Sequence, residues 1–277
     1  MSIVDFQESL RKTGGYSTPP DKQRPFLPRF IASPIFHLYV GLIFFAGYRM
    51  ARDPDFETKK WSQFCYLFHR LTERLGGRIH VSGFDQLAPD AFPVVWVSNH
   101  VSSLETYLLP ETLTIYSRLL IVLKESLAHY PCFGRVVRSL DPIRINRQNA
   151  REDLRKVLTD GQAGLAAGRS VLIFPQGQRT PQFDPAGFNS LGIKLAQRAK
   201  VPIVPLAVRT DYLGLGRLVK ELGPVQPRRP VCIACGPLLP PEMDAREQQR
   251  ACTDFISGKL CQWEQEDGGT LLANSIV

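Results

Sequence analysis

A histidine followed five positions later by a carboxylate is the pair of residues in this sequence with the clearest chemical potential. His100 comes three positions after the end of residues 92–97, an apolar and β-branched run that predicts a buried strand. Residues 104–109 predict the first turns of a helix. Two residues five apart in one helix point about 140° away from each other. His100 and Glu105 can therefore meet only if His100 precedes the helix and Glu105 lies in its first turn.

The pair predicts general-base catalysis. Glu105 would accept a hydrogen bond from one ring nitrogen of His100, and the other nitrogen could then take a proton from a hydroxyl. A substrate that brings its own hydroxyl needs no Ser or Cys nucleophile. Ser102 or Ser103 at the helix N-cap would give the required geometry. A structural alternative stays open, because the same residues fit a capping box in which Glu105 binds only the N-cap amide.

A second set of candidate residues is cationic, and each member follows a predicted strand. Lys124, Arg147 and Arg179 occupy such positions, as His100 does. Ligands of parallel α/β sheets bind at the carboxyl ends of the strands, so we expect the four side chains on one edge of the sheet. Cations beside a general base indicate an anionic substrate that carries a hydroxyl, and a phosphate ester fits this description.

Short strands and helices alternate from Arg78 onwards. This alternation predicts an α/β fold with a mostly parallel central sheet flanked by helices. Strands are predicted at 79–82, 93–98, 118–123, 142–145, 170–174, 203–208 and 231–235. Helices are predicted near 104–110, 125–139, 150–167, 189–199 and 244–263.

An N-terminal hydrophobic helical segment precedes this α/β region and predicts membrane anchoring. Residues 30–48 carry no formally charged side chain if His37 is neutral, and they are long enough either to span a bilayer or to enter one leaflet and return. Residues 61–75 have the apolar spacing of an amphipathic helix. We expect a flexible N-terminal segment at 1–25, membrane-associating helices at 26–77, the α/β domain at 78–265 and a flexible tail at 266–277.

The composition of the chain limits the classes of binding partner that we expect. The formal net charge is +8, which favours anionic surfaces and phosphorylated ligands. The sequence has no zinc-finger spacing and no long basic arm, so we expect no nucleic-acid partner. Cys232 and Cys235 form the one CxxC motif, but residues three apart on a strand face opposite sides, so we expect core packing and no metal site.

With these residues in place, the sequence resembles the glycerolipid acyltransferase family that contains the 1-acylglycerol-3-phosphate acyltransferases. The resemblance covers about residues 80–240 and rests on four motifs that occur in the family's order. The family's His-x4-Asp becomes His100 to Glu105, with Glu in place of Asp, and its Phe-Pro-Glu-Gly-Thr-Arg becomes Phe174 to Arg179, with Gln176 in place of Glu and Gln178 in place of Thr. The other two are Ile143 to Arg147 and Val201 to Pro205.

This resemblance implies a membrane-associated acyltransferase on the cytoplasmic face of the inner membrane. His100, oriented by Glu105, would activate the free hydroxyl of a lysophospholipid, most simply 1-acyl-sn-glycerol-3-phosphate, for attack on acyl-CoA or an acylated carrier protein. No metal or prosthetic group is implied. The acceptor's phosphate would be bound by Lys124, Arg147, Gln176, Gly177 and Arg179. The alternatives are an acyltransferase for another lyso-lipid or amino-lipid acceptor, and a non-catalytic lipid or acyl-carrier binding protein of the same fold.

Overall fold

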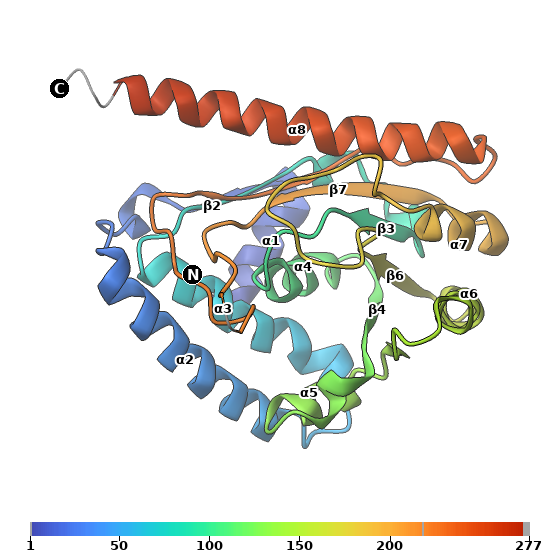
Figure 1. The fold of residues 1–277 in the computed structure, drawn as a ribbon, viewed down its shortest axis with the longest axis horizontal. Coiled ribbons are helices and arrows are strands. Elements are labelled where there is room, and N and C mark those ends of the chain that lie inside the picture. Colours follow the sequence, from blue (N-terminus) through green and yellow to red (C-terminus); the bar gives the residue numbers. More distant parts are fainter. Residues whose placement is uncertain (1, 218, 274–277) are drawn as a thin grey trace.

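The computed structural model describes residues 2–217 and 219–273, and its centre is a sheet of eight strands (Figure 1). The strands are β1 (Tyr16–Ser17), β2 (Ile79–Ser82), β3 (Val95–Ser98), β4 (Arg118–Lys124), β5 (Ile143–Ile145), β6 (Arg169–Ile173), β7 (Ile203–Arg209) and β8 (Val231–Cys235). The helices are α1 (Ile3–Thr13), α2 (Arg29–Met50), α3 (Trp61–Arg74), α4 (Glu105–Leu113), α5 (Phe133–Ser139), α6 (Ala150–Ala166), α7 (Leu191–Ala199) and α8 (Ala245–Ala273).

The strands lie in the order β1-β2-β8-β7-β3-β6-β4-β5. All strands from β7 to β5 in this order run parallel, and β2 is parallel to β8. The β1–β2 and β7–β8 pairs are antiparallel. The carboxyl ends of β3, β6, β4 and β5 consequently meet at one edge of the sheet, and the α/β prediction with a mostly parallel sheet is confirmed.

The central strands are buried on both faces. In β3, Trp96 packs into the core beneath α2, α3 and α4, whereas Val95 and Val97 pack into a second core beneath α6, α7 and α8. This alternation follows from the two-residue period of a strand. Cys232 and Cys235 of β8 likewise fall into opposite cores, as we expected from their spacing. In Figure 1, α8 lies above the sheet and α2 lies on the opposite side.

The α2 helix is half buried. Gly47 allows close packing on α3, since a Cβ at this position would lie 2.4 Å from the ring of Phe64. Phe36 and Ile43 point into the core, but six large apolar side chains on other sides of the helix are exposed. Among the described residues, α2 is the one helix long and apolar enough to cross a membrane. The exposed set is Phe30, Ile31, Leu38, Tyr39, Leu42 and Phe45.

Three expectations for the chain's segments need correction. Part of the supposedly flexible segment 1–25 is ordered, because α1 buries Phe6 and Leu10 and β1 joins the sheet. The predicted helix at 125–139 is interrupted near Pro131, which has no N–H to donate, and α5 begins only at Phe133. At the other end, α8 continues to Ala273 through most of the predicted tail, and residues 274–277 lie outside the described residues.

A buried ionic cluster ties the N-terminal segment to α3 and α4. The Nδ1 atom of His69 lies 2.6 Å from Glu111 Oε1 of α4, and its Nε2 atom lies 3.6 Å from Glu73 Oε1. Glu73 accepts hydrogen bonds from Tyr16 and Thr18. Burial alone would lower the pKa of His69, but the two carboxylates outweigh it and raise this pKa to about 9. The cluster therefore holds a protonated imidazole at neutral pH inside the core.

Candidate active site

His100 and Glu105 lie together, as their spacing predicts. His100 sits in the turn after β3, Glu105 is the first residue of α4, and His100 Nδ1 is 2.8 Å from Glu105 Oε1. The N-cap of α4 is Leu104, not Ser102 or Ser103 as we expected. The two serine hydroxyls are used elsewhere, by the Glu105 carboxylate and by Arg179.

Glu105 is fully buried, with 0% of the residue exposed, and its carboxylate is surrounded by donors. It accepts backbone N–H groups of Val101 and Ser102 at 2.6 and 2.8 Å, and hydroxyls of Ser102 and Thr210. The capping-type bond to Ser102 and the bond from His100 thus coexist. Burial acts to raise the pKa of Glu105, but the hydrogen bonds from His100 and Thr210 outweigh it and hold this pKa below its ordinary value. Glu105 is therefore ionised at neutral pH.

The imidazole of His100 is held on two sides and open on a third. Its ring stacks on Phe174 with ring centroids 4.3 Å apart, and 14% of its side chain is exposed. Because the carboxylate of Glu105 faces Nδ1, the Nδ1 atom carries the proton and Nε2 keeps a lone pair. No hydrogen-bond partner of Nε2 occurs among residues 2–217 and 219–273. The arrangement can accept a proton from a bound hydroxyl.

Gln176 supports the turn that carries His100 from the loop after the neighbouring strand β6. Its side-chain oxygen accepts the backbone N–H of His100 at 2.7 Å, and its amide nitrogen donates to Thr180 Oγ1 at 2.6 Å. The backbone N–H of Thr180 in turn donates to the carbonyl of His100 at 2.9 Å. Both ends of the Gln176 amide are thus used within the protein. This arrangement differs from our expectation that Gln176 faces the substrate's phosphate.

Arg179 reaches the same turn from the loop after β6. One of its nitrogens donates to Ser103 Oγ and another binds the carboxylate of Glu221. Only 17% of the Arg179 side chain is exposed, so the guanidinium lies in the wall of the site. The expected position of Arg179 beside His100 therefore agrees with the structure, but its present anionic partner is Glu221.

The remaining predicted residues lie on the same edge of the sheet. Gly177 has a φ of 66° and turns the chain after β6, so a residue with a Cβ would be strained there. Lys124 ends β4 and Arg147 follows β5, and both are exposed. Since neighbouring strands are about 4.8 Å apart, the end of β5 lies about 14 Å from the end of β3. Lys124 and Arg147 therefore extend the cationic rim away from His100.

Several residues with clear roles here were missed from the sequence. Asn99 locks the turn to β7, because its side chain donates to the carbonyl of Val208 and accepts the N–H of the same residue, both at 2.8 Å. Thr210 binds Glu105, and Glu221 binds Arg179. Thr210 directly follows β7, so the strand-end rule that selected Lys124 and Arg179 could have found it. Glu221 lies in a long loop with no comparable signal.

Within the described residues, no group of three or more His, Cys, Asp or Glu side chains is arranged to hold a metal ion. The fold and the site define a protein of the α/β class with a histidine–glutamate pair at the carboxyl edge of its sheet. Residues 78–209 match the family model described as Acyltransferase. This part of the chain is an acyltransferase domain, and it is similar to the 1-acyl-sn-glycerol-3-phosphate acyltransferases.

Two curated relatives, both named as 1-acyl-sn-glycerol-3-phosphate acyltransferases, are similar to this chain. The chain is 33% identical over 152 residues to a 1-acyl-sn-glycerol-3-phosphate acyltransferase of Pseudomonas aeruginosa. The aligned region covers 55% of this chain and 56% of that relative. The chain is 30% identical over 185 residues to one of Chlamydomonas reinhardtii, covering 66% of this chain and 53% of the relative. The matches thus span about half the length of these curated relatives.

A solved structure shares the fold. The crystal structure of the 1-acyl-sn-glycerophosphate acyltransferase PlsC from Thermotoga maritima matches with a TM-score of 0.62 and 18% sequence identity. The match covers 86% of this chain and 98% of that chain, so the two folds agree over most of their length.

Proposed function

We propose that this protein transfers an acyl group from an acyl thioester to the free hydroxyl of a lysophospholipid, with 1-acyl-sn-glycerol-3-phosphate as acceptor and phosphatidic acid as product. The observation that carries the proposal is the 2.8 Å contact between His100 Nδ1 and the buried Glu105, which leaves Nε2 as a base at the open side of the site. The names of the relatives supply the acceptor.

The reaction proceeds by direct attack. Nε2 of His100 removes the proton from the acceptor's hydroxyl while the oxygen forms a bond to the thioester carbonyl carbon. The ionised Glu105 stabilises the imidazolium that results. When the carbon–sulfur bond breaks, the imidazolium returns its proton to the leaving thiolate. The chain supplies no covalent nucleophile in this scheme, and the thioester donor, acyl-CoA or an acylated carrier protein, supplies the activation.

Arg179 is the cation best positioned for the acceptor's phosphate. Its contact with Ser103 fixes it to the segment between His100 and α4, and a guanidinium can bind phosphate oxygens through two parallel hydrogen bonds. Lys124 and Arg147 contribute positive potential farther along the rim. Gln176 and Gly177 act through the shape of the loop that carries Arg179.

We further propose that α2 rests in one leaflet of the membrane and does not cross it. Its six exposed apolar side chains form a surface suited to the acyl region of a bilayer. Its other side packs on α3, which carries Arg70, Glu73 and Arg74 in its second half and could not accompany α2 through the bilayer. This placement brings the lipid acceptor to the protein from the side of α2, and we place the enzyme on the cytoplasmic face, where thioester donors are available.

The catalytic assignment is tested with His100→Ala and Glu105→Gln in purified protein. We expect His100→Ala to lower kcat by about 10³-fold, because the general base is lost. His129, with a side chain that is 74% exposed, provides the matched control His129→Ala, which should keep full activity. Products are identified by lipid mass spectrometry from a panel of lysolipids and both donor types. Near-normal turnover of folded His100→Ala would refute the mechanism, and a preference for another lyso-lipid or an amino-lipid would replace the acceptor.

The membrane assignment is tested by flotation with liposomes. Leu42→Asp/Phe45→Asp places two charges on the exposed face of α2 and should abolish liposome binding while leaving the folded state intact. Leu154→Asp alters an exposed leucine on α6 and serves as the control. If the α2 variant still floats with the liposomes, another surface binds the membrane.

A further inference from the structure

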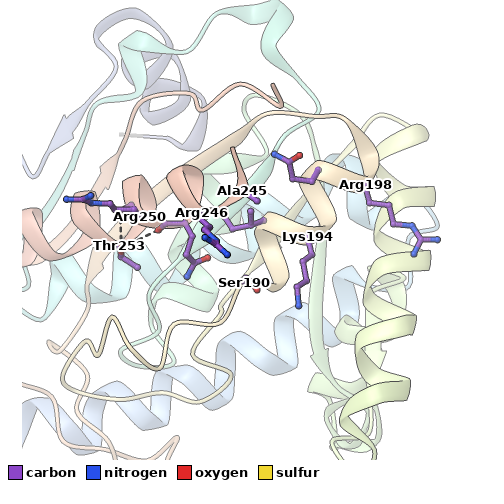
Figure 2. Close-up of a pocket in the computed structure, with 10 residues that line it drawn as sticks. Ser190, Lys194, Arg198, Ala245, Arg246, Arg250 and Thr253 are labelled. Atoms are coloured by element: carbon purple, nitrogen blue, oxygen red, sulfur yellow. Dashed lines mark hydrogen bonds between the residues drawn. The ribbon is translucent and has the colours of Figure 1, made fainter. Parts of the chain in front are cut away.

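A groove between α7 and α8 is lined by cations and lies outside the catalytic site (Figure 2). Its volume is about 800 Å³, and it runs from Ser190 to Thr253 along the two helices. Lys194 and Arg198 come from α7, and Arg246 and Arg250 come from α8. No acidic residue is among its lining residues in the described part of the chain.

The four cations are arranged as two rows. Residues four apart lie on the same side of a helix, so each helix presents two positive charges one turn apart. All four side chains are exposed. Arg198 donates to Gln162 and Arg250 pairs with Asp254, whereas the side chains of Lys194 and Arg246 make no ion pair with any residue that the structure describes. Two exposed, separated rows suit an extended acidic surface better than a single phosphate group, which needs converging donors.

The groove lies on the face of the sheet opposite α2, and one end of it is near His100. The α7 and α8 helices cover the face of the sheet opposite α2, so the groove stays open to water when α2 meets lipid (Figure 1). One end of the groove is close to the catalytic turn. A Cβ on Gly192 of α7 would lie 2.7 Å from Val97, and Val97 precedes His100 by three residues, which corresponds to about 10 Å along a strand. Asn189, just before this end, donates to the carbonyl of Pro175 in the loop that carries Arg179.

We propose that this groove docks the acyl donor in the form of an acidic carrier protein, with an acidic helix of the carrier lying along the two cationic rows. This inference rests on the proposed acyl transfer. The carrier's flexible thioester arm enters at the Ser190 end and reaches the edge of the sheet where His100 lies, while the lipid acceptor arrives from the α2 side. Charge complementarity of this kind acts mainly through faster association and falls with ionic strength.

The test uses Lys194→Glu/Arg246→Glu, which reverses one cation in each row. The control Arg155→Glu/Arg228→Glu makes the same change of net charge at exposed residues outside the groove. Binding of a fluorescently labelled bacterial acyl carrier protein is measured by anisotropy at low and high salt. Steady-state transfer is measured with palmitoyl-carrier protein and with palmitoyl-CoA.

We expect the groove variant to raise the carrier's Kd and lower kcat/KM with the acylated carrier by about tenfold, and to remain within about twofold of wild type with palmitoyl-CoA. The control should match wild type with both donors. An unchanged Kd in the groove variant, or wild-type protein that does not bind the carrier, would overturn the proposal. An equal loss with palmitoyl-CoA would also overturn it, in favour of a nucleotide site. Wild-type protein that binds the carrier but transfers no acyl group would refute the proposed function and leave the docking surface supported.

Discussion

The carboxylate of Glu221 lies against the guanidinium of Arg179, on the nitrogen next to the one that binds Ser103. In the mechanism that we propose, Arg179 binds the acceptor's phosphate, so an acidic side chain of the protein occupies part of the place where that phosphate is expected. Burial acts to raise the pKa of Glu221, but the hydrogen bond from Arg179 outweighs it and lowers this pKa. Glu221 is thus charged, and we expect it to compete with the proposed anionic substrate.

Removing this competitor should improve substrate binding. In Glu221→Gln we expect KM for the lysophosphatidate acceptor to fall by a factor of about 2 to 5 with kcat unchanged, because the side chain of Glu221 is 48% exposed and such exposed ion pairs contribute up to about 1 kcal/mol. Initial-rate measurements over a range of acceptor concentrations give both constants. Lys220→Gln is the control on the neighbouring residue. A raised KM would mean that Glu221 positions Arg179 instead of competing for it.

Gln176 departs from the family motif, and its contacts indicate which substitutions it should tolerate. A glutamate at this position could also accept the N–H of His100, with Thr180 as the donor to its second oxygen, whereas an apolar residue could do neither. We expect Gln176→Glu to keep kcat within about threefold and Gln176→Leu to lower it by about tenfold or more, since a buried N–H loses its partner. Equal activities of the two variants would show that the bond to His100 has no bearing on turnover.

We expect Thr210 to affect the rate of acyl transfer through its hydrogen bond to Glu105. Thr210→Val removes a hydroxyl that binds the buried carboxylate, and hydrogen bonds to charged groups contribute about 1.5–3 kcal/mol. Because this bond holds the pKa of Glu105 down, its loss should raise that pKa and move the acid limb of the kcat–pH profile to higher pH. Thr210→Ser keeps the hydroxyl and should restore the wild-type profile. A lower rate with an unmoved acid limb would indicate a packing defect only.

The His69 cluster predicts a dependence of stability on pH. The folded protein raises the pKa of His69 from 6.5 to about 9, so the stabilising contribution is complete below pH 6.5 and is lost as pH rises through 9. A shift of this size corresponds to about 3 kcal/mol in the free energy of unfolding. Glu111→Gln removes one of the two carboxylates and should move this loss to lower pH, whereas the exposed Glu247→Gln should not. Denaturant unfolding between pH 6 and about 10 measures the effect, and identical curves for wild type and Glu111→Gln would contradict it.

Sequence patterns predicted the elements whose residues follow a simple period. Strands β2 and β8 match their predicted ranges, because a buried strand flanked by turns is a strong local signal. His100 and Glu105 were predicted to meet because only one arrangement of strand, turn and helix allows it. Arg179 was placed on the same edge of the sheet as His100 because both residues follow predicted strands of a parallel sheet.

Contacts between distant segments could not be predicted in this way. Tyr16 binds Glu73 from 57 positions away, and this contact helps to order a segment whose composition suggested flexibility. Thr210 reaches Glu105 across 105 positions, and Glu221 reaches Arg179 across 42. These partners depend on strand order and loop path, and neither quantity is encoded in the spacing of residues along the chain.

The attachment of α2 to the loop that carries Glu221 has a practical consequence for producing this enzyme. The hydroxyl of Ser33 accepts the N–H of Val225 at 2.9 Å, and the ring of His37 donates to the carbonyl of Gly223 at 2.8 Å. A truncation that removes the apolar helix α2 to improve solubility would also remove both hydrogen bonds. It would expose the apolar core residues on which α2 packs. Detergent or nanodisc preparations of the whole chain are accordingly the right material for kinetics, and swapping in an unrelated anchor would not restore the loop.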